Sequence, residues 1–248
     1  MGVRSWLLGG PTRELLRRTL GERWQNGLDW LLVSDTQNLR RERQRRALES
    51  SVAFIERELP EAPSFSRPLH LLGHGLGQVR VEGEGLYLEF GVYRGTTINW
   101  LASRTNHVVY GFDSFEGLPD RWREGFERGR FKTGGLPSVR QNVRLVPGWF
   151  DQTLPGCVAE HREPVAFLHV DCDLYSSTRT IFSFLGERLV PGSVIVFDEF
   201  FNYPGWEDGE ARAFREIVKA QALEFEYLGY CHLGQQVAVR VLRNPARG

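Results

Sequence analysis

The 248-residue sequence has few cysteines, no excess of charge of one sign and no long apolar run. Its three cysteines show neither a disulfide framework nor zinc spacing, which favours a reducing compartment such as the cytoplasm. Basic and acidic residues number 31 each, so a long-range attraction to nucleic acid is not expected. No apolar stretch approaches the length of a membrane span, and the N-terminus lacks the apolar core of a signal peptide. We therefore expect a cytoplasmic protein with neither nucleic acid nor a membrane as its partner.

Helical patterns dominate the N-terminal segment, residues 1–60. Four apolar residues recur there at helical spacing, namely Leu48, Val52, Ile55 and Leu59. The arginine-rich run 40–46 is typical of a solvated helix face, and a site for an acidic substrate or partner is the alternative. Prolines between residues 60 and 68 interrupt the helical pattern, and the glycine-rich stretch 70–85 is predicted to be a loop or a short hairpin. We therefore predict an N-terminal helical extension over residues 1–80.

Residues 81–248 are predicted to form one α/β domain. Apolar strand patterns alternate there with helical ones, which predicts a mostly parallel sheet covered on both faces. Seven strands are expected, at 86–90, 108–113, 142–146, 165–171, 193–198, 224–230 and 236–242. The last two are close enough in sequence to pair antiparallel. Helices are expected at 96–104, 176–189 and 207–222, and Ser176 or Ser177 is a natural N-cap for the second.

A glycine-containing turn follows the first of these strands. Gly91 and Gly95 occupy this turn, and glycines there allow the backbone to approach a ligand closely. Asp113 ends the next strand about 20 residues later, where an acid can accept hydrogen bonds from a ribose diol. The spacing Glu89-x-Gly91-x-x-x-Gly95 is not the G-x-G-x-x-G of a pyrophosphate-binding turn. This difference favours S-adenosylmethionine, which has no pyrophosphate, over NAD.

Four carboxylates follow two later strands. Asp171 and Asp173 come at the end of the fourth predicted strand, and Asp198 and Glu199 at the end of the fifth. Ligands of open α/β sheets bind at the carboxyl ends of the strands, so these acids should converge if the two strands are neighbours. Hard oxygen ligands of this kind suit magnesium or calcium. The alternative is that the acids cap helices and accept hydrogen bonds from loop amides.

Five motifs occur in order between residues 86 and 214. They are EFGVYRG, YGFDSFEGLP, VPGWFDQTLP, LHVDCDLYSST and PGSVIVFDEF, of which FDSFEGLP is the most specific. In order and spacing they resemble the class I S-adenosylmethionine-dependent methyltransferases, and more narrowly the macrocin O-methyltransferase (TylF-like) family. The resemblance implies a Rossmann-like class I methyltransferase fold and direct transfer of a methyl group from a sulfonium to a substrate oxygen.

The resemblance also implies roles for individual residues. Those implied to bind S-adenosylmethionine are Glu89, Gly91, Tyr93, Gly95, Asp113, Ser114, Phe115, Gly148, Trp149, Phe150 and Asp171. The glycine turn would lie at the methionine end of the cofactor, Asp113 at the ribose, and Trp149 near the adenine, where an aromatic face can stack. Asp171 would be the catalytic acid under the reacting centre, placed to accept the proton of the acceptor hydroxyl.

A magnesium site is implied by the same comparison. In metal-using members of the family, an acid at this position and a following acid pair hold the cation. The matching residues are Asp171, Asp198 and Glu199. Glu199 departs from the commoner Asp-Asp pair, but its longer side chain can still ligate. We therefore expect activity assisted by Mg²⁺.

The predicted function is S-adenosylmethionine-dependent O-methylation of a hydroxyl on a small molecule, such as a sugar or another natural-product group. Two alternatives stay open here: a non-catalytic binding module that keeps the cofactor fold, and a nucleotide-cofactor oxidoreductase. The missing G-x-G-x-x-G argues against the oxidoreductase, and the four acids argue against lost turnover. The long connection 114–141 lies at the carboxyl edge of the sheet, so we expect it to shape the acceptor pocket. The acceptor is not predicted, and a homo-oligomer is left open.

Overall fold

The computed structural model describes Gly27 and residues 37–246. Among these residues, eight strands form one sheet in the order β1-β7-β8-β6-β5-β2-β3-β4. The strands are β1 (Ser64–Phe65), β2 (Leu86–Phe90), β3 (Val109–Asp113), β4 (Val143–Pro147), β5 (Val165–Val170), β6 (Leu189–Phe197), β7 (Glu224–Cys231) and β8 (Val237–Arg243). All neighbouring pairs are parallel except those that include β8. The predicted mostly parallel sheet with an antiparallel C-terminal pair is therefore confirmed.

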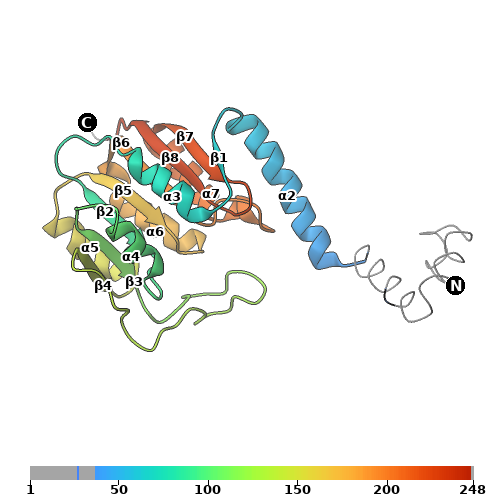
Figure 1. The fold of residues 1–248 in the computed structure, drawn as a ribbon, viewed down its shortest axis with the longest axis horizontal. Coiled ribbons are helices and arrows are strands. Elements are labelled where there is room, and N and C mark those ends of the chain that lie inside the picture. Colours follow the sequence, from blue (N-terminus) through green and yellow to red (C-terminus); the bar gives the residue numbers. More distant parts are fainter. Residues whose placement is uncertain (1–26, 28–36, 247–248) are drawn as a thin grey trace, which may run out of the picture.

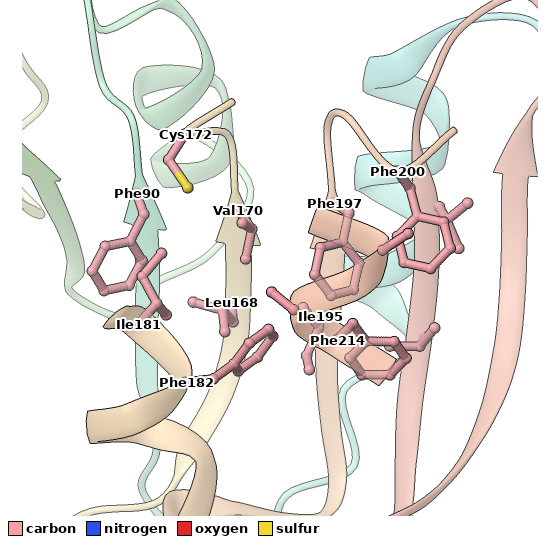
Figure 2. Close-up of a cluster of buried hydrophobic side chains, with 14 of the residues drawn as sticks. Phe90, Leu168, Val170, Cys172, Ile181, Phe182, Ile195, Phe197, Phe200 and Phe214 are labelled. Atoms are coloured by element: carbon pink, nitrogen blue, oxygen red, sulfur yellow. The ribbon is translucent and has the colours of Figure 1, made fainter. Parts of the chain in front are cut away.

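Helices cover both faces of this sheet (Figure 1). They are α2 (Leu39–Glu58), α3 (Pro68–Gly77), α4 (Thr96–Ala102), α5 (Phe150–Glu160), α6 (Tyr175–Leu185) and α7 (Glu210–Gln221), with short 3₁₀ turns at Gly186–Arg188 and Trp206–Asp208. Apolar residues of α5, α6 and α7 pack on one face, and those of α3 and α4 pack on the other. Figure 2 shows the first of these cores, formed by Phe90, Leu168, Ile195, Ile181, Phe182 and Phe214. In the described part of the chain, no helix is both long and apolar enough to cross a membrane.

The chain reverses its direction across the sheet twice, and the first reversal lies between β4 and β5. From β2 it moves outward through β3 to β4, and it then returns to place β5 on the other side of β2. Ligands of open α/β sheets bind in the crevice at such a reversal, outside the carboxyl ends of the strands. The fold therefore directs attention to the ends of β2 and β5.

The N-terminal part of the described chain contacts the same sheet. Strand β1 pairs in parallel with the edge strand β7. On the inner side of α2, the ring of Phe54 lies 5.4 Å from that of Trp206. Ser51 Oγ accepts the Asn202 N–H at 2.8 Å, and the Trp206 indole N–H donates to Ser50 Oγ at 2.9 Å. Residues 1–26 and 28–36 of the predicted extension lie outside the described part, and its boundary near residue 80 stays a prediction.

Two helices differ from the sequence expectation. The stretch predicted as a loop or hairpin, 70–85, contains most of α3, which begins with Pro68 at its first position. Proline suits that position because the first-turn N–H groups have no partner within a helix. Helix α5 was not predicted, since it carries Pro155 in its interior, where proline normally breaks a helix. Within the arginine-rich run, Arg45 forms an ion pair with Glu42 at 2.9 Å on an exposed face of α2.

The predicted bounds of the helix at 176–189 are wrong at both ends. Helix α6 begins at Tyr175 after Leu174, so Ser176 and Ser177 lie in the first turn and do not cap it. It ends at Leu185, and the chain continues from Gly186 as a 3₁₀ turn. Leu189 then begins β6.

Candidate active site

The turn after β2 requires glycine at its first position. Gly91 has φ +99°, and an added Cβ would lie 1.7 Å from the carbonyl oxygen of Asp171. The turn therefore packs directly on the backbone at the end of β5, with the Asp171 N–H donating to the Phe90 carbonyl at 2.9 Å. Gly95 has φ +79° and precedes α4 as its N-cap residue. This close packing leaves backbone, and not side chains, at the centre of the crevice.

The carboxylate of Asp113 holds this turn in place. Its Oδ2 accepts the N–H groups of Val92 at 2.9 Å and Tyr93 at 2.7 Å, and its Oδ1 accepts that of Phe115 at 2.7 Å. Tyr93 and Phe115 have φ of 47° and 58°, so two non-glycine residues adopt the left-handed conformation beside it. Such strain is found where the surrounding structure enforces it, often at functional sites. Asp113 thus joins the turn after β2 to the loop after β3.

A cavity of about 530 Å³ opens at the carboxyl ends of the parallel strands. Eight of the residues predicted from the sequence line it: Gly91, Tyr93, Asp113, Ser114, Trp149, Phe150, Asp171 and Glu199. Asp173, Ser176 and Ser177 also line it. The cavity therefore brings the glycine turn, Asp113, the aromatic residues after β4 and the acids after β5 and β6 around one space.

The remaining predicted residues lie beside the cavity and not on its wall. Glu89 is fully buried in β2, with its Oε2 3.2 Å from His169 Nδ1 on β5. Burial raises the pKa of Glu89, and the hydrogen bond from His169 opposes that rise. Phe115, Gly148 and Asp198 adjoin lining residues in sequence, and Gly95 lies two residues after Tyr93; none of the four lines the cavity itself.

Three acids meet at the ends of β5 and β6. Ligand atoms of Asp171, Asp198 and Glu199 all lie within 4.8 Å of one another. Burial, followed by the charge of Asp198, raises the pKa of Asp171 and of Glu199 well above the ordinary range. Glu199 Oε2 is buried without a hydrogen-bond partner among the described residues. The cluster therefore favours either bound protons or a cation.

Two further acids surround this cluster. Burial raises the pKa of Asp173 to about 7, and the nearby charge of Arg123 opposes the rise. Glu210, the first residue of α7, is fully buried and accepts the Glu199 N–H at 3.2 Å. Burial raises the pKa of Glu210 well above the ordinary range. Glu210 thus positions the backbone that carries Glu199, a role that its sequence position at a helix start did not indicate.

The long connection 114–141 contributes cavity residues that sequence reasoning did not identify. Trp122, Arg123, Phe126 and Phe131 line the cavity. Aromatic and basic residues alternate in this connection, which could have indicated a binding loop. Their positions depend on contacts with distant residues, such as the ring of Tyr203, 5.7 Å from that of Trp122.

Part of the chain matches a known domain family. Residues 88–200 match the model of a methyltransferase domain. The chain is 31% identical over 141 residues to "8-demethyl-8-(2,3-dimethoxy-alpha-L-rhamnosyl)-tetracenomycin-C 4'-O-methyltransferase" of Streptomyces olivaceus, covering 47% of this chain and 53% of that protein. It is 28% identical over 149 residues to "Demethyldecarbamoylnovobiocin O-methyltransferase" of Streptomyces niveus, covering 50% and 56%. The matched region thus spans about half the length of these curated relatives.

Solved structures agree in fold. The O-methyltransferase NovP superimposes with a TM-score of 0.56 at 21% identity, over 71% of this chain and 79% of that one. The calicheamicin methyltransferase CalS11 does so with a TM-score of 0.55 at 22% identity, over 97% and 96%. Both share the Rossmann-like arrangement described above. The matched domain model covers residues 88–200, and the solved structures support a Rossmann-like fold.

Proposed function

We propose that this protein transfers a methyl group from S-adenosylmethionine to a hydroxyl of a small molecule, such as a sugar or another natural-product group. One observation carries the proposal: the glycine turn with Asp113 and the acids after β5 and β6 line a single cavity. A methyl donor bound at the glycine turn and Asp113 would face a methyl acceptor bound at the acids. The printed names of the two Streptomyces relatives, both O-methyltransferases of natural products, support this class of acceptor.

The cofactor would lie along the ends of β2, β3 and β4. The turn at Gly91 admits the methionine part, and Asp113 has lone pairs left for the ribose after accepting three N–H groups. Trp149 and Phe150 line the cavity beyond β4, where the adenine can stack. In the transfer the S–CH₃ bond would break as the O–CH₃ bond forms, S-adenosylhomocysteine would leave, and Asp171 in its ionised form would accept the hydroxyl proton. The raised pKa of Asp171 makes its ionised form a stronger base.

The acid cluster fits a divalent cation. Its donors are carboxylate oxygens, which suit magnesium, and the buried Glu199 Oε2 lacks any other partner among the described residues. Asp171, Asp198 and Glu199 would hold the ion. When bound, it would lower the pKa of the acceptor hydroxyl and orient it. The acids also serve without it, as a general base and its hydrogen-bonded supports.

Calorimetry with S-adenosylmethionine and NAD tests the cofactor, and we expect binding of the first alone. Formation of S-adenosylhomocysteine in the presence of hydroxylated acceptors tests turnover. Binding of NAD without S-adenosylmethionine would overturn the proposal. We place the protein in the cytoplasm, in keeping with three free buried cysteines, and take residues 1–80 as an extension that precedes the catalytic domain.

A further inference from the structure

One cavity residue, Arg123, carries a charge that no described residue neutralises by direct contact. Its guanidinium carbon lies 3.7 Å from the ring centroid of Trp122, 4.7 Å from that of Phe126 and 5.4 Å from that of Tyr203. No hydrogen bond or ion pair joins the Arg123 side chain to another residue in the described part of the chain. A guanidinium has five N–H donors and no acceptor. These donors are therefore left for water or for a ligand in the cavity that Arg123 lines.

The aromatic rings hold this guanidinium in a defined place. A turn closed by the Phe126 N–H to the Arg123 carbonyl, at 2.9 Å, brings the ring centroids of Trp122 and Phe126 to 5.1 Å from each other, and the guanidinium of Arg123 lies over both rings. Tyr203, which is buried, contributes the third ring from the segment after β6. Stacked arginines are planar and orient their donors in a fixed fork. Arg123 is thus a positioned donor group and not a mobile surface charge.

Acids line the cavity close to this donor. Asp173 and Glu199 are near enough for their charges to oppose the lowering of the Arg123 pKa that burial causes. Ionised carboxylates only accept hydrogen bonds, whereas the guanidinium only donates them. A hydroxyl group does both. A ligand with two oxygens on adjacent carbons can therefore give a proton to the acids with one and accept from Arg123 with the other.

We propose that Arg123 is a specificity-determining residue that selects acceptors with a second oxygen on the carbon next to the methylated hydroxyl. This inference rests on the proposed function. The second oxygen of the acceptor needs only to accept a hydrogen bond from Arg123. A hydroxyl or an ether oxygen can do so, and a methylene group cannot.

Three methyl glycosides test the selection. The first carries only two hydroxyls, on adjacent carbons; the second has one of them as a methoxy group; the third has that oxygen removed. Initial rates of S-adenosylhomocysteine formation with Mg²⁺ present give kcat/KM for the shared hydroxyl. We expect similar values for the first two and a value about 10- to 100-fold lower for the third, the usual effect of one hydrogen bond to a charged group.

Variants separate Arg123 from the rest of the cavity. Arg123→Met keeps an unbranched side chain against the rings but has no donors, so the three glycosides should become nearly equal while S-adenosylmethionine binds as before. Arg123→Lys should restore part of the difference. Arg128→Met, at an exposed position of the same connection outside the cavity, should behave like the unchanged protein.

Three results would overturn the inference: equal rates for all glycosides, discrimination that survives in Arg123→Met, or no methylation of any glycoside by protein that binds S-adenosylmethionine. Failure to bind S-adenosylmethionine in calorimetry would instead overturn the proposed function. The two failures are therefore distinguishable.

Discussion

The two sides of the cavity are built from different groups. Beside β2 and β3, the wall is backbone: a glycine turn, strained residues such as Tyr93, and one carboxylate that is already hydrogen-bonded three times. Beside β5 and β6, the wall is side chains, with buried acids that raise one another's pKa and an arginine without a direct partner. The hydrogen-bonding groups beside β2 and β3 have partners without a ligand, whereas the acids and the arginine beside β5 and β6 do not have them among the described residues.

This difference separates what each side can do. A preformed, satisfied wall binds a constant ligand with little rearrangement, as a cofactor site needs. Acids and donors that lack partners gain the most favourable free energy when an acceptor molecule, a proton or a cation binds to them. Changes on the cofactor side should therefore alter binding and folding, and changes on the acid side should alter turnover.

The largest effect is expected from breaking the backbone wall with Gly91→Ala. The added Cβ would meet the Asp171 carbonyl at 1.7 Å, which forces β2 and β5 apart. We expect a loss of about 3 kcal/mol or more in the free energy of unfolding and loss of S-adenosylmethionine binding. Gly83→Ala is the matched control, because Gly83 also has positive φ but nothing within 4 Å of an added Cβ. Denaturant unfolding and calorimetry measure both effects; equal losses in the two variants would contradict the packing argument.

A change on the acid side should separate turnover from binding. Asp198→Asn removes one charge from the cluster, and we expect turnover to fall by on the order of 100-fold because ionisation of the acceptor loses support. S-adenosylmethionine affinity should change little. Activity should also fall with EDTA and return with Mg²⁺. Asp208→Asn, at an exposed acid farther along the same segment, is the control. Full activity in EDTA would contradict a role for a metal. The acids would then act as a proton acceptor and the residues that hydrogen-bond to it.

Asp113→Ala tests the carboxylate that holds the turn on the cofactor side. It should weaken S-adenosylmethionine binding by about 1–3 kcal/mol, the cost of a lost charge-assisted hydrogen bond. Some destabilisation is expected as well, because three N–H groups lose their acceptor. Asp113→Asn, which keeps one carbonyl oxygen, should lie between the two proteins. If a folded Asp113→Ala variant binds with unchanged affinity, Asp113 does not contact the ribose.

The smallest effect concerns stability and pH. Burial raises the pKa of Glu210, so the folded chain binds this proton more tightly than the unfolded chain. The contribution to stability is full below the unfolded pKa of about 4.3 and is lost as pH rises through the folded pKa. The free energy of unfolding should therefore fall as pH rises above that value, and Glu210→Gln should make this slope shallower. Glu207→Gln, which changes an exposed acid nearby, should keep the original slope.

Strands were more predictable than helices. The patterns at 108–113 and 142–146 correspond closely to Val109–Asp113 and Val143–Pro147, because buried parallel strands are short continuous apolar runs. Helices α3 and α5 were missed because tertiary packing overrides the glycines of the first and Pro155 of the second. Local composition alone does not report that packing.

Site residues that follow strands were predicted from the sequence, and site residues in the long connection were not. The acids Asp171, Asp198 and Glu199 follow strands that prove to be neighbours, so strand order alone brings them together. Their roles stay predictions until variants are assayed. Arg123 and Trp122 were not predicted, since a long connection without helix or strand has no periodicity to fix its path. The burial of Glu210 could not be predicted from the sequence, because it depends on contacts with the segment after β6.

The pairing of β1 with β7 means that this edge of the sheet can form only late in synthesis of the chain. Ser64 and Phe65 leave the ribosome long before Tyr230 and Cys231, yet they bond only to that last part of the sheet. The segment that carries β1 therefore has no strand to pair with until every other parallel strand has been synthesised. Until β7 pairs with β8 and offers its edge, α2 and α3 have only part of their final contacts. Closure of the sheet edge is thus a late event, and a nascent chain shortened before residue 224 exposes surface that the finished protein covers.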